Sequence, residues 1–404
     1  MKKLTYKHTI YACFIGYIVQ AIVNNFVPLL FLTFHTTYGI PLSKITFLVT
    51  FNFALQMLID AVSAGFIDKI GYRAAAMLAH IFAATGFILL TILPSVMSDP
   101  FAGIMISVLV YAVGGGLLEV LISPIVEACP TDNKEMAMSM LHSFYCWGHV
   151  AVVLLSTIFF SIVGIEHWKM MALIWAVVPI LNIFLFAKVP VNHLIAEDEQ
   201  GLGIFDLIKM RSFWILMLLM VCAGASEQAV SQWASTFAEL GLGVSKTVGD
   251  LAGPMLFAIF MGISRAIYGK FGEKIKLEHF MVYSAVLCVG SYLLISFSPS
   301  PVLGLVGCGI CGLSVGIMWP GTFSMAAAGI KNGGTLMFAL FALAGDVGCS
   351  GGPTVVGMVS SALGDDLNKG ILAGIIFPML LLVGIILNHL EKNKRQLKNR
   401  SGEA

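Results

Sequence analysis

Residues 101–126 read FAGIMISVLVYAVGGGLLEVLISPIV and contain a single charged side chain, Glu119. A helix that crosses the hydrocarbon core of a bilayer needs roughly 20 mostly apolar residues. The stretch is longer than that, so it predicts a membrane-spanning helix. An acid inside such a helix is costly unless it faces a cavity or a partner. Glu119 is therefore a candidate functional residue.

The composition of the whole chain agrees with this first helix. The 404 residues are 58% hydrophobic and 11% charged, and the mean hydropathy is +0.92. Soluble domains are roughly one quarter charged, so lipid is the solvent that suits this chain. The net charge of +1 supplies no basic field, and we expect no nucleic-acid partner.

Apolar stretches of spanning length recur along the chain and divide into six and six. We predict an all-α membrane protein with 12 transmembrane helices in two pseudo-symmetric six-helix bundles. Residues 1–190 form the first bundle, 191–211 a cytoplasmic linker, 212–390 the second bundle and 391–404 a basic cytoplasmic tail. The spans are predicted at 9–33, 43–66, 74–94, 101–126, 137–163, 168–188, 212–238, 248–268, 279–297, 301–328, 334–361 and 368–390.

The basic residues predict the orientation in the membrane. With the N-terminus in the cytoplasm, the cytoplasmic segments hold 19 Lys and Arg, Arg265 among them, and the other side holds 4; together these are the 23 of the chain. Cytoplasmic loops carry the excess of Lys and Arg. We therefore expect a multi-pass protein of the cell inner membrane, embedded in the lipid bilayer, with both termini in the cytoplasm.

The two halves repeat each other at an offset near 200. Gly116-Leu117 followed by Pro124 matches Gly312-Leu313 followed by Pro320. Phe144-x-x-x-Gly148-x-Val150 likewise matches Phe341-x-x-x-Gly345-x-Val347. Repeated halves with the same orientation are typical of transporters, in which the substrate binds near the middle of the membrane between the halves. We expect the halves to enclose a polar chamber.

Four acids lie within the predicted spans: Asp60, Glu119, Glu227 and Asp346. Asp60 lies toward the cytoplasmic end of its span, and we interpret it as a structural residue that pairs locally. We expect Glu119 and Glu227 to line a cavity. These two acids and Asp346 are the candidates for proton or ion coupling. The open alternative for each is a buried, protonated acid with a purely structural role.

Amides and aromatic residues share the spans with these acids. Amide and carboxyl groups exchange hydrogen bonds with hydroxyl groups, and aromatic faces can stack on a sugar ring, so the set suits a neutral polyhydroxylated solute. Packing between helices is the alternative role for the tryptophans. No metal site is expected, because His142 and His149 of the fifth span lack a third ligand nearby in the sequence. The candidate substrate-binding residues are Asn24, Asn25, Asn52, Gln56, Glu119, His142, Tyr145, Trp147, His149, Glu227, Gln228, Gln232, Trp233 and Trp319.

One loop carries a resemblance to a known family. The sequence Ala64-x-x-x-Asp68-Lys69-Ile70-Gly71-Tyr72-Arg73 resembles the loop signature of the major facilitator superfamily, with Ala64 where the signature usually has Gly. The resemblance implies the major facilitator fold and a conformational latch formed by Asp68, Gly71 and Arg73. The second copy has Gly269 in place of the acid, so its latch should be weaker.

A narrower resemblance rests on two helices. Residues 116–124 and 141–148 resemble the fourth and fifth helices of the fucose–proton symporter family, with Ser123 in place of an Asn. The resemblance implies that Glu119 takes part in proton and sugar coupling. The acid that this family carries in the first helix is matched by Asn25. Glu227 is then a candidate for the second protonation site.

The leading functional prediction is a secondary active transporter that moves a small polar solute, with a sugar as the predicted class, by alternating access with proton or sodium coupling. The alternatives are a multidrug or metabolite exporter of the same superfamily and a transporter-like solute receptor. A membrane enzyme is disfavoured, because the chain has no HExxH pair, nucleophile elbow or P-loop. We expect no cofactor and a monomer.

Overall fold

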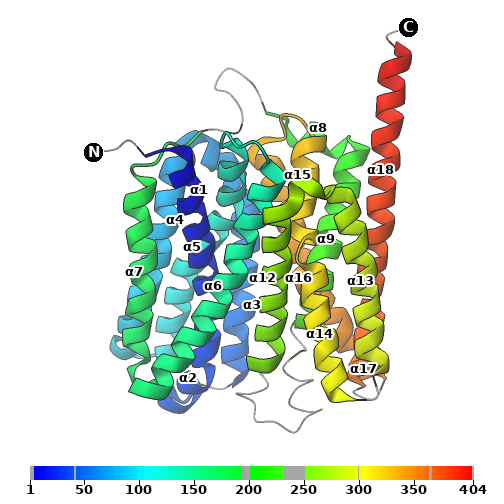
Figure 1. Ribbon diagram of the computed structural model, residues 1–404. Coiled ribbons are helices and arrows are strands. Elements are labelled where there is room, and N and C mark those ends of the chain that lie inside the picture. Colours follow the sequence, from blue (N-terminus) through cyan, green and yellow to red (C-terminus); the bar gives the residue numbers. More distant parts are fainter. Residues whose placement is uncertain are drawn as a thin grey trace. The chain divides into compact units, whose positions relative to one another are not determined.

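The computed structural model describes residues 4–40, 42–192, 194, 201–231, 234, 251–298, 300–363 and 366–402. The described secondary structure is helical, with no strand among these residues (Figure 1). Helices are expected here, because a helix satisfies its own backbone hydrogen bonds and lipid offers none. The predicted all-α class is confirmed.

Ten helical stretches of the described chain are long and apolar enough to cross a membrane. Two further helices, α3 and α12, occupy the remaining predicted spans. Their bounds are Leu42–Ile70 and Leu256–Phe271. The helices therefore account for all twelve predicted spans.

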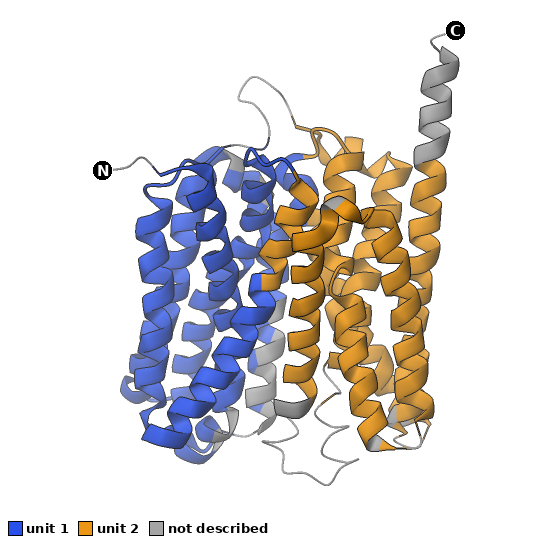
Figure 2. Ribbon diagram, in the orientation of Figure 1, with its two compact units in different colours: residues 1–132, 144–200, 334–339 blue, residues 133–143, 201–333, 340–404 orange. Residues whose placement is uncertain are grey.

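Clustering of contacts divides the chain into two compact units, coloured separately in Figure 2. Unit 1 comprises residues 1–132, 144–200 and 334–339, and unit 2 comprises residues 133–143, 201–333 and 340–404. The continuous helices α6 and α16 each begin in one unit and end in the other. The predicted bundle boundaries at 190 and 212 remain a prediction.

Unit 1 contains the helices of the first half of the chain. The short elements η1 and α2 continue the first span after α1 ends, so the predicted span 9–33 is not one helix. The elements are α1 (Tyr6–Asn25), η1 (Val27–Leu30), α2 (Phe31–Tyr38), α3, α4 (Tyr72–Val96), α5 (Pro100–Ala128), α6 (Lys134–Val163), η2 (Ile165–His167) and α7 (Trp168–Phe186).

Three consecutive glycines, 114–116, allow α5 to pack closely against its neighbouring helices in unit 1. A Cβ atom at Gly114 would lie 2.5 Å from the backbone oxygen of Ala79 in α4, and one at Gly116 would lie 3.2 Å from the Cα atom of Gln56 in α3. Small residues let membrane helices approach this closely. The run therefore brings α3 against α5 only a turn away from Glu119.

Unit 2 contains the helices of the second half. Two predicted spans are interrupted: 301–328 divides into α14 and α15, and 368–390 divides into α17 and α18. The elements are α8 (Ile204–Ile208), α9 (Arg211–Ser231), η3 (Leu251–Met255), α12, η4 (Gly272–Lys274), α13 (Leu277–Phe297), α14 (Pro301–Val315), α15 (Met318–Gly329), α16 (Gly334–Ala362), α17 (Leu367–Gly374) and α18 (Ile376–Gly402).

Glycines four residues apart bring α14 against α12. A Cβ atom at Gly312 would lie 2.3 Å from the backbone oxygen of Phe257, and one at Gly316 would lie 2.7 Å from the Cβ atom of Ser264. This small-x-x-x-small spacing permits close helix packing in membranes. Gly316 is thereby placed against the turn of α12 that carries Arg265.

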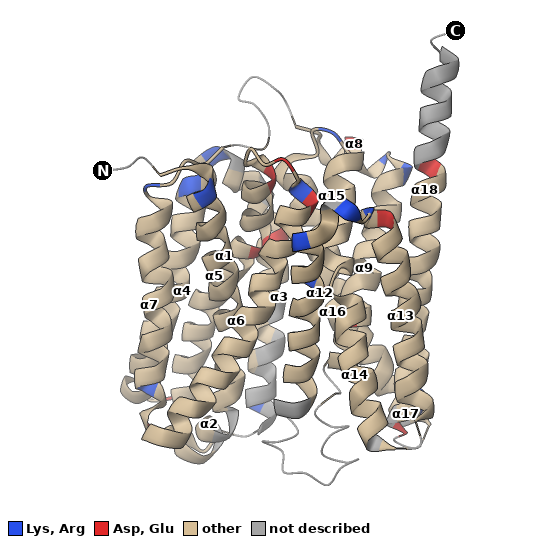
Figure 3. Ribbon diagram, in the orientation of Figure 1, with Lys and Arg blue, Asp and Glu red and all other residues tan. Residues whose placement is uncertain are grey.

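Charged residues of each unit gather mainly near helix ends (Figure 3). Arg265 is an exception. The prediction that it lies in a cytoplasmic segment is wrong. It lies within α12, is 3% exposed and pairs with Glu227. Removing it from the tally leaves 18 cytoplasmic basic residues against 4. The predicted orientation does not depend on it.

Candidate functional site

The α3 face in unit 1 carries three polar residues at four-residue spacing, Asn52, Gln56 and Asp60. Residues four apart share one face of a helix. The spacing therefore correctly predicts that Asn52 and Gln56 lie together, and it extends to Asp60. All three are buried, with Gln56 and Asp60 at 0% exposure.

Asn24 of α1 joins this face. Its Oδ1 accepts a hydrogen bond from Gln56 Nε2 at 2.8 Å and one from Asn52 Nδ2 at 3.3 Å. Its own Nδ2 donates to the Tyr145 hydroxyl of α6 at 3.5 Å. The adjacent Asn25 differs, because its Nδ2 donates to the backbone oxygen of Ala21 within α1 at 2.9 Å.

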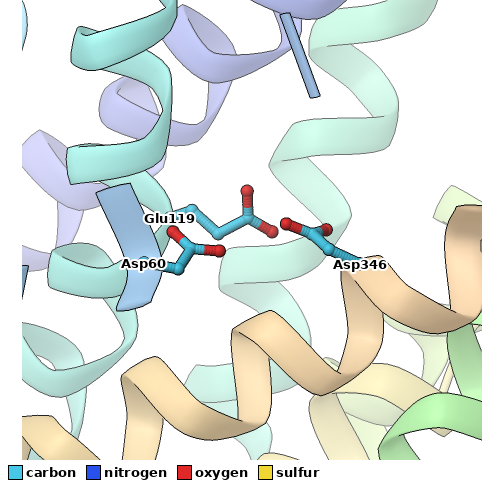
Figure 4. A group of neighbouring side chains, drawn as sticks. All are labelled: Asp60, Glu119 and Asp346. Carbon is cyan, nitrogen blue, oxygen red and sulfur yellow. The ribbon is translucent and has the colours of Figure 1, made fainter. Parts of the chain in front are cut away.

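Glu119 of α5 lies beside the same cluster. Gln20 of α1 donates from Nε2 to Glu119 Oε2 at 2.8 Å. Asp60 and Glu119 each present a carboxylate oxygen within 4.8 Å of the other, and Figure 4 shows the two groups on α3 and α5. The sequence interpretation of Asp60 as a residue that pairs locally therefore missed its proximity to Glu119.

Several buried oxygens of this cluster accept no hydrogen bond from the described residues. They are Gln20 Oε1, Asn52 Oδ1 and Gln56 Oε1. A buried acceptor without a donor costs about 1–3 kcal/mol. Three such carbonyl oxygens around one carboxyl pair favour a ligand that brings its own hydrogen-bond donors. We call Gln20, Asn24, Asn52 and Gln56 the amide cluster.

The aromatic candidates on the unit 1 part of α6 differ in whether they contact the amide cluster. Tyr145 contacts the amide cluster through Asn24. Trp147 is 36% exposed and His149 is partly buried, and neither takes part in the hydrogen bonds of the cluster. Gly148 packs on α1, where its Cβ atom would lie 3.0 Å from the Cα atom of Ile18. This close approach brings Tyr145 to Asn24.

Unit 2 holds a buried ion pair. Arg265 Nη2 of α12 donates to Glu227 Oε2 of α9 at 3.2 Å, and the side chains are 4% and 11% exposed. Gln228 Nε2 lies 3.4 Å from Glu227 Oε1. Arg265 is therefore a buried basic residue inside a spanning helix and not a cytoplasmic one. The sequence identified Glu227 as unusual but not its partner.

Of the other candidates in unit 2, His142 contacts this pair, because its backbone oxygen accepts from Arg265. The Trp319 ring of α15 packs where Gly345 of α16 lacks a side chain, since a Cβ atom there would meet the ring. His142 stacks on Phe323 at a centroid distance of 5.9 Å. Asp346 of α16 is 7% exposed. Gln232 and Trp233 lie outside the described residues.

The predicted latch residues lie at the turn between α3 and α4. Gly71 has a φ of +80°, a conformation that favours glycine. Arg73 Nη1 donates to the backbone oxygens of Phe186 at 3.1 Å and Ala187 at 2.9 Å, at the C-terminus of α7. A cation there stabilises the last carbonyls of a helix. The Asp68 side chain lies outside the described part, so the latch stays a prediction.

The fold and this arrangement of buried polar groups define a polytopic transport protein. The family model of the Major Facilitator Superfamily matches residues 12–353, and the chain belongs to this superfamily. The predicted family and the 12-helix major facilitator fold are thereby confirmed. Members of this family are transporters, which agrees with the prediction that the chain is not an enzyme. No curated protein sequence matches the chain.

Solved structures share the fold at low identity. The E. coli fucose:proton symporter, in the outward conformation, has a TM-score of 0.79 and 16% identity over 94% of this chain and 98% of that one. A proton:xylose symporter has a TM-score of 0.76 and 10% identity over 94% of both chains. The human organic anion transporter has a TM-score of 0.71 and 16% identity over 95% and 99%.

Proposed function

We propose that the chain is a proton-coupled importer of a monosaccharide or a related polyol. The observation that carries this proposal is the amide cluster with its buried oxygens that lack a donor. Sugar hydroxyl groups donate hydrogen bonds, and each also accepts, so they match amides that present both kinds of atom. The structural likeness to the fucose and xylose symporters is consistent with this substrate class.

The same groups disfavour the alternative substrates. An apolar drug would leave the amide oxygens without donors, at a cost of about 1–3 kcal/mol each. An organic anion would meet the carboxyl groups of Asp60 and Glu119 in unit 1. In unit 2 the Arg265 guanidinium is already paired with Glu227. A neutral donor-rich solute supplies the donors that the amide oxygens of unit 1 lack.

The carboxyl pair supplies the proposed proton site. Two ionised carboxylates whose oxygens lie within 4.8 Å repel each other, and one proton shared between them removes the repulsion. Asp60 would then take the role of the first-helix acid that Asn25 replaces. Gln20 donates to Glu119 and belongs to the amide cluster, so solute binding and proton binding share a side chain.

Uptake into proteoliposomes tests this function. We expect the purified chain to accumulate at least one of radiolabelled fucose, xylose, galactose or glucose under an inward proton gradient, and not under a sodium gradient alone. Glu119→Gln and Asp60→Asn should each abolish proton-driven accumulation. Glu166→Gln is the matched control, because that acid is exposed on η2 and should leave uptake unchanged.

The other outcomes distinguish the alternatives. Efflux of a fluorescent drug without uptake of any sugar would favour an exporter. Sugar binding without flux would favour a receptor. Sodium-driven uptake that survives both acid substitutions would overturn the proton site while retaining the transporter.

A further inference from the structure

The interruption between α14 and α15 has a specific chemical origin. In a helix, the backbone oxygen of Gly316 accepts from the amide four residues later, and that residue is Pro320, which has no N–H. Helix α14 ends at Val315 and α15 begins at Met318. Pro320 thus falls in the first turn of α15, where a missing N–H is tolerated.

Arg265 supplies the donor that the proline cannot. Its Nε donates to the Gly316 backbone oxygen at 2.7 Å. Its Nη1 donates to the backbone oxygen of His142 in α6 at 3.0 Å, and Nη2 pairs with Glu227 at 3.2 Å. One guanidinium therefore joins the interruption, the unit 2 part of α6 and the carboxylate of α9.

The charge of Glu227 is required for this arrangement. A buried guanidinium is stable beside a carboxylate, but it becomes an uncompensated buried cation when that carboxylate takes up a proton from water. It would then turn toward water or another acceptor, and the Gly316 oxygen would lose its donor. Protonation of Glu227 would thereby change the backbone geometry.

The first half of the chain provides an internal comparison. The repeat places Pro124 at the position of Pro320, yet α5 continues unbroken from Pro100 to Ala128. The offset of 201 that aligns Gly269 with Asp68 pairs Arg265 with Ala64. At this pair of prolines, the half with the arginine is the half with the interruption. A break also precedes Pro378, between Gly374 of α17 and Ile376 of α18, so an arginine is not needed for every break.

We propose that Glu227 and Arg265 form a protonation switch that sets the geometry of the α14–α15 interruption, and so positions Trp319. Arg265 is a positioning residue in this scheme. Trp319, the candidate for stacking on a sugar, lies three residues beyond Gly316. The inference deepens the proposed proton coupling. The remaining buried carboxyl group and histidine in the described part of unit 2 are Asp346 and His142, the latter held through its backbone oxygen.

Hydrogen–deuterium exchange of the full chain in nanodiscs tests the switch without any substrate. The amides of residues 316–319 and 321 are followed from pH 5 to pH 8, with the intrinsic pH dependence of exchange removed. In the wild type we expect this segment to lose protection as the pH falls, by roughly tenfold or more, the factor for one charge-assisted hydrogen bond. In Glu227→Gln, the amides of this segment should be as weakly protected at every pH as they are in the wild type at low pH.

A proline variant separates the switch from a general loss of structure. Arg265→Lys keeps a positive charge for Glu227, but one ammonium cannot serve three separate acceptors. We expect the backbone amides of this segment to lose protection in the Arg265→Lys variant. Adding Pro320→Ala restores an amide for the Gly316 oxygen, so the double variant should regain protection and lose its pH dependence.

Controls and refuting outcomes follow from the same structure. Glu278→Gln removes an acid whose pair with His389, at 2.9 Å, is exposed, and it should leave residues 316–321 unchanged. Peptides of α4 and α5 report whether each variant remains folded. Wild-type protection in Glu227→Gln, or no recovery in the double variant, overturns the switch. Either result leaves the sugar-uptake test standing, so the two proposals fail separately.

Discussion

Asn24→Ala should destabilise the protein far more than Asn25→Ala, although the two residues are adjacent amides of α1 and both are partly buried. The difference is in what they bind. Asn24 Oδ1 accepts from Gln56 and Asn52 of α3, whereas Asn25 donates to a backbone oxygen of its own helix. The family resemblance points instead to Asn25 as the position that replaces a functional acid.

The magnitude follows from the donors that lose their acceptor. A neutral hydrogen bond contributes about 0.5–1.5 kcal/mol, and a buried donor left without a partner costs about 1–3 kcal/mol. Asn24→Ala leaves the amides of both Gln56 and Asn52 in this state, which gives a loss of about 2–6 kcal/mol. Asn25→Ala removes one bond, at about 0.5–1.5 kcal/mol. The gain in helix propensity from Asn to Ala is the same in both variants and cancels in the comparison.

Thermal unfolding of the two purified variants in one detergent measures this difference directly. Binding of the transported sugar, measured on the same samples, shows whether the amide cluster also serves recognition; we expect Asn24→Ala to weaken binding and Asn25→Ala to preserve it. Equal destabilisation by the two variants, or a larger effect at Asn25, would refute the reasoning from hydrogen-bond partners.

Two further predictions concern packing and pH. Gly114→Ala should lower stability by about 1–3 kcal/mol, because its Cβ atom would meet the Ala79 backbone oxygen at 2.5 Å. Gly290→Ala is the control and should be tolerated, because a Cβ atom there would meet nothing within 4 Å. Thermal unfolding of both variants measures the difference. Asp366 caps α17, and the hydrogen bond from the Lys369 side chain lowers its pKa below the ordinary 3.8. Its contribution to stability is therefore present above pH 3.8 and lost only as the pH falls through the lower folded pKa. With the intrinsic pH dependence of exchange removed, amide protection in α17 should be unchanged from pH 5 to pH 8, and a transition there would contradict the assignment.

Hydropathy predicted the helices well because a membrane leaves a chain few choices. The predicted span 279–297 corresponds to Leu277–Phe297, and 137–163 corresponds to Lys134–Val163. Each spanning segment must satisfy its backbone internally and present apolar side chains to lipid. Length and composition therefore suffice to locate it within a few residues. The short elements η1 and α2 were missed, because they are as apolar as the helix they follow.

The site was less predictable, because it depends on neighbours from other helices. The spacing of Asn52 and Gln56 indicates a shared face, but the sequence gives no sign that Asp60 meets a carboxyl group of α5. Arg265 was missed for a different reason. The basic residues Lys270 and Lys274 follow it closely and mark the end of the span, so Arg265 was grouped with them. The predicted span 248–268 already contains Arg265, and only its pairing with Glu227 becomes apparent in the structure.

The interruption of the tenth span shows where a sequence repeat is most informative. Prolines lie inside α4, α5, α7 and α16 without interrupting them, so proline is not sufficient to predict a break. The break at Gly316 has in addition a donor from another helix, Arg265, at a position where the first half has Ala64. The matches between the halves identify the common fold. The mismatch identifies the position at which the second half carries a buried charge, Arg265, which pairs with Glu227 and donates to the Gly316 oxygen.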